Sequence, residues 1–169
     1  LNLITDSLPA LALGLEPVEP DVMKRSPRDP DAPLLSRRGW VATALQGGMF
    51  ALITLIAYFV GSRVWGQVEL GETMAFAVLS LSQLVHAFNM RSTHSLFRVG
   101  FGSNRPMLGA FGVSLLLMLA VLLIPGVQGV FSVVAMGARA WGLVAGLSLA
   151  PLPVMELAKL IRRLSHGEE

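Results

Sequence analysis

The stretch that decides the fold is PMLGAFGVSLLLMLAVLLIP, residues 106–125, which contains no charged side chain. A helix of about 20 apolar residues is long enough to cross the hydrocarbon core of a bilayer. Pro106 suits the start of such a helix, and Pro125 suits its stop. We therefore expect a transmembrane helix here whose surface contacts lipid.

Three further stretches have the same apolar character, at about 40–60, 73–90 and 140–160. The whole chain is 53% hydrophobic and only 14% charged, and its mean hydropathy is +0.63. The hydrophobic fraction is higher, and the charged fraction lower, than in ordinary soluble domains. Together with a shorter opening helix, the sequence predicts an all-α membrane protein, a five-helix transmembrane bundle whose first helix is incomplete and interrupted by Pro9.

The opening segment, residues 1–15, has neither an initiator Met nor a leading polar flank. Asp6 stands where a signal peptide would have its apolar region, and no basic region precedes it. We therefore expect a fragment cut within a transmembrane helix, and not a signal peptide.

The basic residues are distributed unevenly between the connecting segments. Of the 13 Lys and Arg residues, only Arg63 and Arg139 lie in the segments 61–72 and 126–139. The others lie in 16–38, in 91–105 and in the C-terminal tail. Because short loops rich in Lys and Arg stay cytoplasmic, the first helix should run inward and the C-terminus should be cytoplasmic. The sequence pI near 9.7 then reflects contact with lipid headgroups of the bilayer, and no motif suggests a nucleic-acid partner.

Asn2, Thr5 and Asp6 place three oxygen-bearing side chains at i, i+3 and i+4 within the apolar opening segment. On a helix these three share one face. A carboxylate at mid-bilayer costs roughly 2.5–3.5 kcal/mol on insertion scales, so Asp6 needs compensation. Pro9 cannot donate the helical hydrogen bond to the Thr5 carbonyl, which leaves a further oxygen free. This clustering of oxygens predicts a site for a hard cation.

The span at 73–90 is more polar than membrane anchoring requires. Ser82, His86 and Asn89 share one helix face, and Ser80 and Gln83 lie on a neighbouring face. Polar faces at this depth point into a bundle. We expect His86 to be a hydrogen-bonded bundle residue and not a zinc ligand.

Small residues and prolines predict two further features of the bundle. Glycines in two of the spans should allow close helix packing, and two prolines should kink or unwind the last span. The glycines are Gly47, Gly48, Gly142 and Gly146, and the prolines are Pro151 and Pro153.

The sequence contains no recognisable set of catalytic residues. The sequence has no Gly-rich phosphate loop and no Ser-His-Asp arrangement at a plausible elbow. It has no cysteine, which excludes disulfides and thiolate metal sites. We therefore expect no catalytic residue in the chain and no ATP hydrolysis by the fragment alone.

Several stretches resemble the C-terminal membrane region of calcium-transporting P-type ATPases of the sarcoplasmic-reticulum type. NLITDSLPA at 2–10, ALG at 12–14 and DVMKRSPR at 21–28 resemble the sixth transmembrane helix and the loop after it. PLLS at 33–36 before Gly39-Trp40 resembles the entry to the family's seventh helix. Residues 73–89 resemble the eighth helix, and residues 152–159 resemble the end of the tenth. The resemblance covers essentially the whole chain and is strongest over 1–36.

The resemblance implies that Asn2, Thr5 and Asp6 are ligands of the transported Ca2+. The family's eighth helix supplies a Glu to the first of its two ion sites, and the matching position here is Gln83. An amide oxygen can coordinate a cation but contributes no charge. We therefore expect one calcium ion per transport cycle, with Gln83 as an accessory ion-site residue.

The resemblance also implies that different segments of the polypeptide have different functions. The phosphorylated aspartate and the domains that use ATP and Mg2+ would lie in the upstream part of the same polypeptide. That upstream part would be the partner of this chain. Segment 16–38 would be a cytoplasmic coupling loop, with Asp21, Arg25 and Arg28 as candidate contacts. The expected domains are the ion-site helix 1–15, this loop, a support bundle at 39–164 and a cytoplasmic tail at 165–169.

Two alternatives remain open at this point. One is a P-type pump for another cation, such as Na+, K+, H+ or Mn2+, because selectivity depends on helices outside this chain. The other is a non-enzymatic membrane scaffold whose buried polar residues only hold helices together. In each case we expect a multi-pass integral membrane protein, for a pump most plausibly of a bacterial-type plasma membrane.

Overall fold

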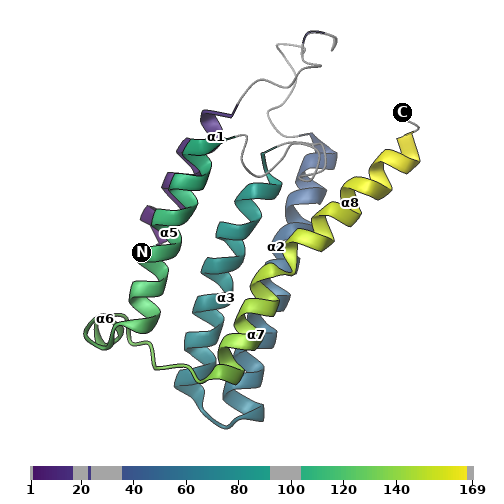
Figure 1. The fold of residues 1–169 in the computed structure, drawn as a ribbon. Coiled ribbons are helices and arrows are strands. Elements are labelled where there is room, and N and C mark those ends of the chain that lie inside the picture. The colour runs from purple at the N-terminus through teal and green to yellow at the C-terminus, as the bar shows by residue number, and fades with distance from the viewer. Residues whose placement is uncertain (1, 17–22, 24–35, 92–103, 167–169) are drawn as a thin grey trace.

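A computed structural model describes residues 2–16, 23, 36–91 and 104–166, with the backbone alone described at 2–6, 38 and 162–166 (Figure 1). The elements in these ranges are helical, which confirms the predicted all-α class. The helices are α1 (Asn2–Gly14), α2 (Arg37–Phe59), η2 (Val60–Val64), α3 (Val68–Asn89), α5 (Arg105–Leu123), α6 (Pro125–Phe131), α7 (Ala138–Leu149) and α8 (Pro151–His166).

Four helical stretches are long and apolar enough to cross a membrane: Gly39–Val64, Val68–Asn89, Arg105–Leu123 and Ala138–Ile161. With the shorter α1 they form the predicted bundle of five membrane helices, so the chain is an integral membrane protein. Helix α1 continues through Pro9, which removes one backbone hydrogen bond without ending the helix.

Helix α3 lies at the centre of the bundle. Half of its apolar window is buried, against 17% for α2 with η2 and for α7 with α8. Helices α2 and α7 pack on one side of α3, and α1 and α5 pack on the other side (Figure 1). The main core joins Met74, Ala77, Val78 and Leu81 of α3 to Ile53, Ala57, Met118, Leu122, Ala140 and Val144. A smaller core near the end of α1 contains Ala12, Phe88 and Met107.

The helix ends gather at two opposite faces of the bundle (Figure 1). The ends of α1, α3 and α8 share one face with the starts of α2 and α5. The basic residues near these helix ends whose side chains are described are Arg37, Arg91, Arg105 and Lys159. The turn after η2 and the segment around α6 lie at the opposite face, to which Arg63 and Arg139 belong. The two faces therefore have the unequal charge that the connecting segments predicted.

Local sequence accounts for several helix boundaries. The Ser36 side chain accepts a hydrogen bond from the Gly39 amide at 3.1 Å and caps α2. Gly66 has a φ of 71°, and this backbone conformation, which suits glycine, reverses the chain between η2 and α3. The expected loop at 61–72 was too long, because η2 extends the second helix to Val64 and α3 begins at Val68.

The prolines act at the predicted places. Helix α5 ends at Leu123, but Pro125 also begins α6, a short helix that the sequence did not predict. The side-chain Nε2 of Gln128 in α6 donates to the Leu122 carbonyl at 2.7 Å, which satisfies an acceptor at the end of α5. The last span breaks at Ala150, with α8 starting at Pro151, as expected.

The prediction of close packing at four glycines was wrong within the described residues. A Cβ added at Gly47, Gly48, Gly142 or Gly146 would meet nothing within 4 Å. The close approach is instead between Gly61 and Gly71. A Cβ on Gly61 would lie 2.5 Å from the Gly71 Cα, so two backbones cross where neither helix has a side chain.

Candidate ion-binding region

The predicted ligands Asn2, Thr5 and Asp6 lie in the first two turns of α1. Their side-chain positions are outside what the structure describes. Asp6 precedes the end of α1 at Gly14 by eight residues, which at 1.5 Å per residue is about 12 Å along the helix. If the end of α1 lies at the surface of a hydrocarbon core about 30 Å thick, that distance corresponds to a position well inside the core.

Helices α1 and α3 run in the same direction, so depths along them can be compared (Figure 1). Ala12 and Phe88 lie in the same small core near the ends of the two helices. Asp6 lies six residues before Ala12, or about 9 Å, and Gln83 lies five residues before Phe88, or about 7.5 Å. Asp6 and Gln83 therefore lie at similar distances before this shared core, on two helices that pack against each other.

The polar face of α3 points into the bundle, as the sequence predicted. Ser82, His86 and Asn89 are all buried. The Asn89 amide nitrogen donates to the Pro151 carbonyl at 3.2 Å and lies 3.5 Å from Nδ1 of His86. The His86 ring also packs edge to face against Phe50 of α2, with centroids 5.1 Å apart. The bond to Pro151 joins α3 to the break between α7 and α8.

Several buried polar atoms have no hydrogen-bond partner in the part of the chain that the structure describes. They are Thr54 Oγ1, Gln83 Oε1, His86 Nε2, Asn89 Oδ1 and Ser148 Oγ. Leaving such an atom unsatisfied costs about 1–3 kcal/mol. The bundle interior thus offers oxygen atoms that a polar occupant or a further polar segment would stabilise, and Gln83 offers one on the helix that packs against α1.

The other predicted site residues, Asp21, Arg25 and Arg28, lie outside the described residues. Within the described ranges, no three His, Cys, Asp or Glu residues come together as a metal-binding group. The Lys159 ammonium lies 3.3 Å from the Glu156 carboxylate within α8, so these two residues form an ion pair.

A second polar cluster joins the end of α1 to two other helices. The Glu16 carboxylate accepts hydrogen bonds from Arg91 Nε at 2.9 Å and from an Arg91 terminal nitrogen at 2.7 Å. Asn104 Nδ2 donates to the same carboxylate at 2.6 Å and to the Ala12 carbonyl at 3.0 Å. The Arg91 side chain is fully buried, and that of Glu16 is 16% exposed. The bonds from Arg91 lower the pKa of the Glu16 carboxyl, and Asn104 adds to this, although partial burial acts to raise it.

The sequence analysis did not find this cluster. It placed Glu16 in a loop and counted Arg91 only as one of the basic residues that set the orientation. Because 75 residues separate these two partners, no local spacing links them. Asn104 two residues before Pro106 is a signal for a helix start, but that signal says nothing of Glu16.

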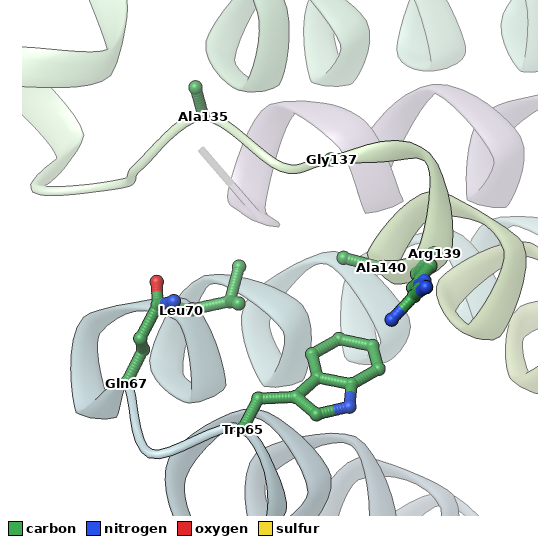
Figure 2. Close-up of a pocket in the computed structure, with 7 residues that line it drawn as sticks. All are labelled: Trp65, Gln67, Leu70, Ala135, Gly137, Arg139 and Ala140. Atoms are coloured by element: carbon green, nitrogen blue, oxygen red, sulfur yellow. The ribbon is translucent and has the colours of Figure 1, made fainter.

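A shallow hollow of about 270 Å³ lies at the opposite face of the bundle, between the turn after η2 and the start of α7. Figure 2 shows the Arg139 side chain directed toward the Trp65 ring, with Gln67 farther along the hollow. None of the predicted ion ligands lines it.

The fold defines an all-α membrane domain with a polar interior. A family model described as "Cation transporting ATPase, C-terminus" matches residues 1–161, and the chain belongs to this family. Its resemblance to the C-terminal membrane region of calcium ATPases is thereby confirmed.

Curated relatives share this region over nearly the whole chain. The chain is 39% identical over 181 residues to Calcium-transporting ATPase 1 of Bacillus cereus. It is 38% identical over 165 residues to a calcium-transporting ATPase of Bacillus subtilis and 35% identical over 164 residues to one of Listeria monocytogenes. Each match covers 96% of this chain but only 20%, 18% and 18% of the respective relative. The chain thus spans about a fifth of the length of these relatives.

Proposed function

We propose that this chain is the C-terminal membrane domain of an ATP-driven pump that exports Ca2+ from the cytoplasm. The observation that carries the proposal is that Asn2, Thr5 and Asp6 are spaced at i, i+3 and i+4 on α1, which packs against the helix that contains Gln83. Membership of the cation-transporting ATPase family supports it. The relatives in three bacteria, which are named calcium-transporting ATPases, support the choice of ion.

The ligand chemistry fits calcium but requires more oxygens than this chain supplies. Calcium takes six to eight oxygen ligands. Asn2, Thr5 and Asp6 offer side-chain oxygens, Pro9 leaves the Thr5 carbonyl without its helical donor, and Gln83 adds an amide oxygen. The remaining ligands would come from other helices of a longer polypeptide. An ion bound there offsets the cost of keeping Asp6 charged in the membrane.

In this proposal the chemistry of ATP takes place outside the chain. ATP, Mg2+ and a phosphorylated aspartate belong to upstream domains, and their conformational change moves the ion-binding helices. Segment 16–38 transmits that change, with Asp21, Arg25 and Arg28 as its contacts. Residues 39–164 form the support bundle that holds α1, and 165–169 form a tail.

The charge distribution gives the orientation. The face that contains the ends of α1, α3 and α8 would be cytoplasmic, because most basic residues belong to segments at that face. The bacterial sources of the relatives named above support a plasma membrane as the location.

The test is ATP-driven 45Ca2+ uptake by inside-out vesicles that contain the full-length protein. Asp6→Asn keeps the shape of the side chain but removes its charge. We expect it to lower apparent calcium affinity by more than about tenfold, as loss of a ligand group does at metal sites. Glu72→Gln is the matched control, because Glu72 is an exposed carboxylate at the start of α3, and it should transport as the wild type does.

Other results would redirect the proposal. Uptake or ATP hydrolysis that responds to Na+, K+, H+ or Mn2+ but not to Ca2+ would indicate a pump for that cation. A wild-type protein that moves no ion with ATP, and in which Asp6→Asn alters only thermal stability, would be a scaffold.

A further inference from the structure

The Glu16 cluster joins three helix ends at one point. Glu16 follows the end of α1, Arg91 follows the end of α3, and Asn104 precedes the start of α5. The contacts cross 75 and 88 residues of sequence. No other ion pair described in the structure joins two helices, because Glu156 and Lys159 both belong to α8.

Asn104 bonds to two helices with its one amide group. Its Oδ1 accepts from the Met107 amide at 2.8 Å and caps the start of α5. Its Nδ2 donates to the Ala12 carbonyl, an acceptor in the last turn of α1, and to Glu16. Movement of α1 along its axis relative to α5 would break both of these latter bonds.

The helix dipoles favour Arg91 at both helix ends that it contacts, and they favour Glu16 at the start of α5 but not at the end of α1. Arg91 lies at the C-terminal ends of α1 and α3, where the helix dipole favours a cation. Glu16 lies beside the N-terminal end of α5, where the dipole favours an anion. The lowered pKa of Glu16 keeps the carboxylate ionised at neutral pH. The Arg91 side chain is fully buried, and removing one partner of a buried ion pair is strongly destabilising.

We infer that Glu16, Arg91 and Asn104 are positioning residues that lock the end of α1 to α3 and α5, and so fix the depth of the ligand residues of α1 relative to Gln83. The consequence for ion affinity rests on the function proposed above. Asp6 lies eight residues before the end of α1, and Glu16 follows that end by two residues, so a displaced end carries the ligand residues with it. The cluster acts through α1 and does not touch the ion.

Asn104→Ser is the most selective variant. A serine hydroxyl can still accept the Met107 amide hydrogen and cap α5, but it cannot donate to both Ala12 and Glu16. Glu16→Gln is the second variant, because it keeps an acceptor for Arg91 and removes the charge. Glu156→Gln is the matched control, since it removes the carboxylate of an ion pair within a single helix.

The first measurement is the distance between spin labels on the full-length protein. The labels are placed at Gly14→Cys and Met90→Cys, two exposed positions at the ends of α1 and α3; cysteines elsewhere in the polypeptide are replaced. We expect a narrow distance distribution in the otherwise unaltered protein and in Glu156→Gln. Asn104→Ser and Glu16→Gln should broaden it or shift it.

The second measurement is the calcium concentration that half-maximally activates transport. We expect Asn104→Ser and Glu16→Gln to raise it roughly three- to tenfold, in the range seen for residues that act on a site from a distance. Maximal rate per folded molecule should change little. A purely structural role would instead reduce the amount of folded protein and leave the activating concentration unchanged.

The inference is overturned if the variants that fold keep the wild-type distance distribution. It is also overturned if the distances change while the activating calcium concentration stays at the wild-type value. If the unaltered protein transports no calcium, the proposed function has failed, and the spin-label distances alone then decide whether the cluster locks α1.

Discussion

At the scale of single residues, charge decides what the two polar positions Asp6 and Gln83 can do. A carboxylate at mid-bilayer costs roughly 2.5–3.5 kcal/mol by insertion scales, and a bound cation offsets this cost. An amide such as that of Gln83 supplies an oxygen at lower cost but does not neutralise an ion. Gln83 Oε1 is buried and has no hydrogen-bond partner among the described residues, and in the proposed function it contributes to the ion site. The missing charge then limits how many divalent ions the domain can hold.

Gln83→Glu tests this limit. If the neutral amide is what disables a second calcium site, restoring a carboxylate should raise the number of calcium ions moved per ATP, or raise the apparent calcium affinity. The measurement is 45Ca2+ uptake against phosphate release by the full-length protein in sealed vesicles.

Gln67→Glu is the control, because Gln67 is an exposed glutamine at the opposite end of α3. It should leave both quantities at their wild-type values. Unchanged stoichiometry together with unchanged affinity in Gln83→Glu would count against the idea that charge at this position limits the site.

At the scale of helices, the contact of α2 and η2 with α3 depends on two glycines. A Cβ at Gly71 would lie 2.7 Å from the Tyr58 carbonyl oxygen and 2.8 Å from the Ser62 nitrogen. These are backbone atoms, which cannot rotate away as the end of a flexible side chain can. The Ser62 hydroxyl donates to the same Tyr58 carbonyl at 2.7 Å, so the polar groups at the crossing are also paired.

We expect Gly71→Ala to destabilise the domain by about 1–3 kcal/mol, the usual range for an overpacked interior. Gly48→Ala is the control, because a Cβ there meets nothing within 4 Å. Removing a helical glycine in open space should leave stability equal or slightly higher. The measurement is thermal unfolding of the detergent-solubilised full-length protein, followed by tryptophan fluorescence. Equal midpoints for the two variants would show that the helices do not cross so closely.

The sequence predicted the spans because the length of an apolar run is a local property. It could not predict which glycines lie at a close contact between helices. Gly47 and Gly61 are both glycines within apolar helical runs, and they differ only in whether another helix backbone lies next to them. The turn after η2 was placed within the right segment, but its length depends on how far the second helix continues. Element type thus follows from the sequence more readily than the contact between elements.

The same division holds for the candidate site. Asn2, Thr5 and Asp6 were found because three oxygens at helical spacing in an apolar run are a local signal, and their role as ligands stays a prediction. The polar face of α3 was also predicted, and burial of Ser82 and His86 confirmed it. The Glu16 cluster could not be predicted, because its geometry depends on chain ends brought together by folding.

At the scale of the whole molecule, two features describe how the domain lies in a membrane. Its helices leave many large apolar side chains exposed, including Leu45, Leu52, Leu55 and Phe59 along α2. Lipid or further helices of the same polypeptide would cover them. The two faces where helices end differ in charge, and Lys and Arg are costly to translocate. The apolar surface thus sets the depth of the domain, and the charge sets its direction.

Thiol labelling of the full-length protein in intact cells tests the direction. Val130→Cys, in α6, replaces a residue that is 78% exposed, and Met90→Cys, at the end of α3, replaces one that is 55% exposed. Cysteines elsewhere in the polypeptide are replaced. A membrane-impermeant maleimide should label position 130 from outside the cell, because α6 lies at the face with few basic residues. Position 90 should react only after the cells are permeabilised.

The two positions act as controls for each other, since each has to react under one condition. The opposite pattern would mean that the basic face is external and that the predicted inward direction of α1 is wrong. Labelling of both positions in intact cells would place α6 and the end of α3 on the same side. In the described part of the chain, the one membrane-spanning helix between Met90 and Val130 is α5. A single crossing puts the two positions on opposite sides of the membrane, so labelling of both in intact cells would mean that α5 does not cross.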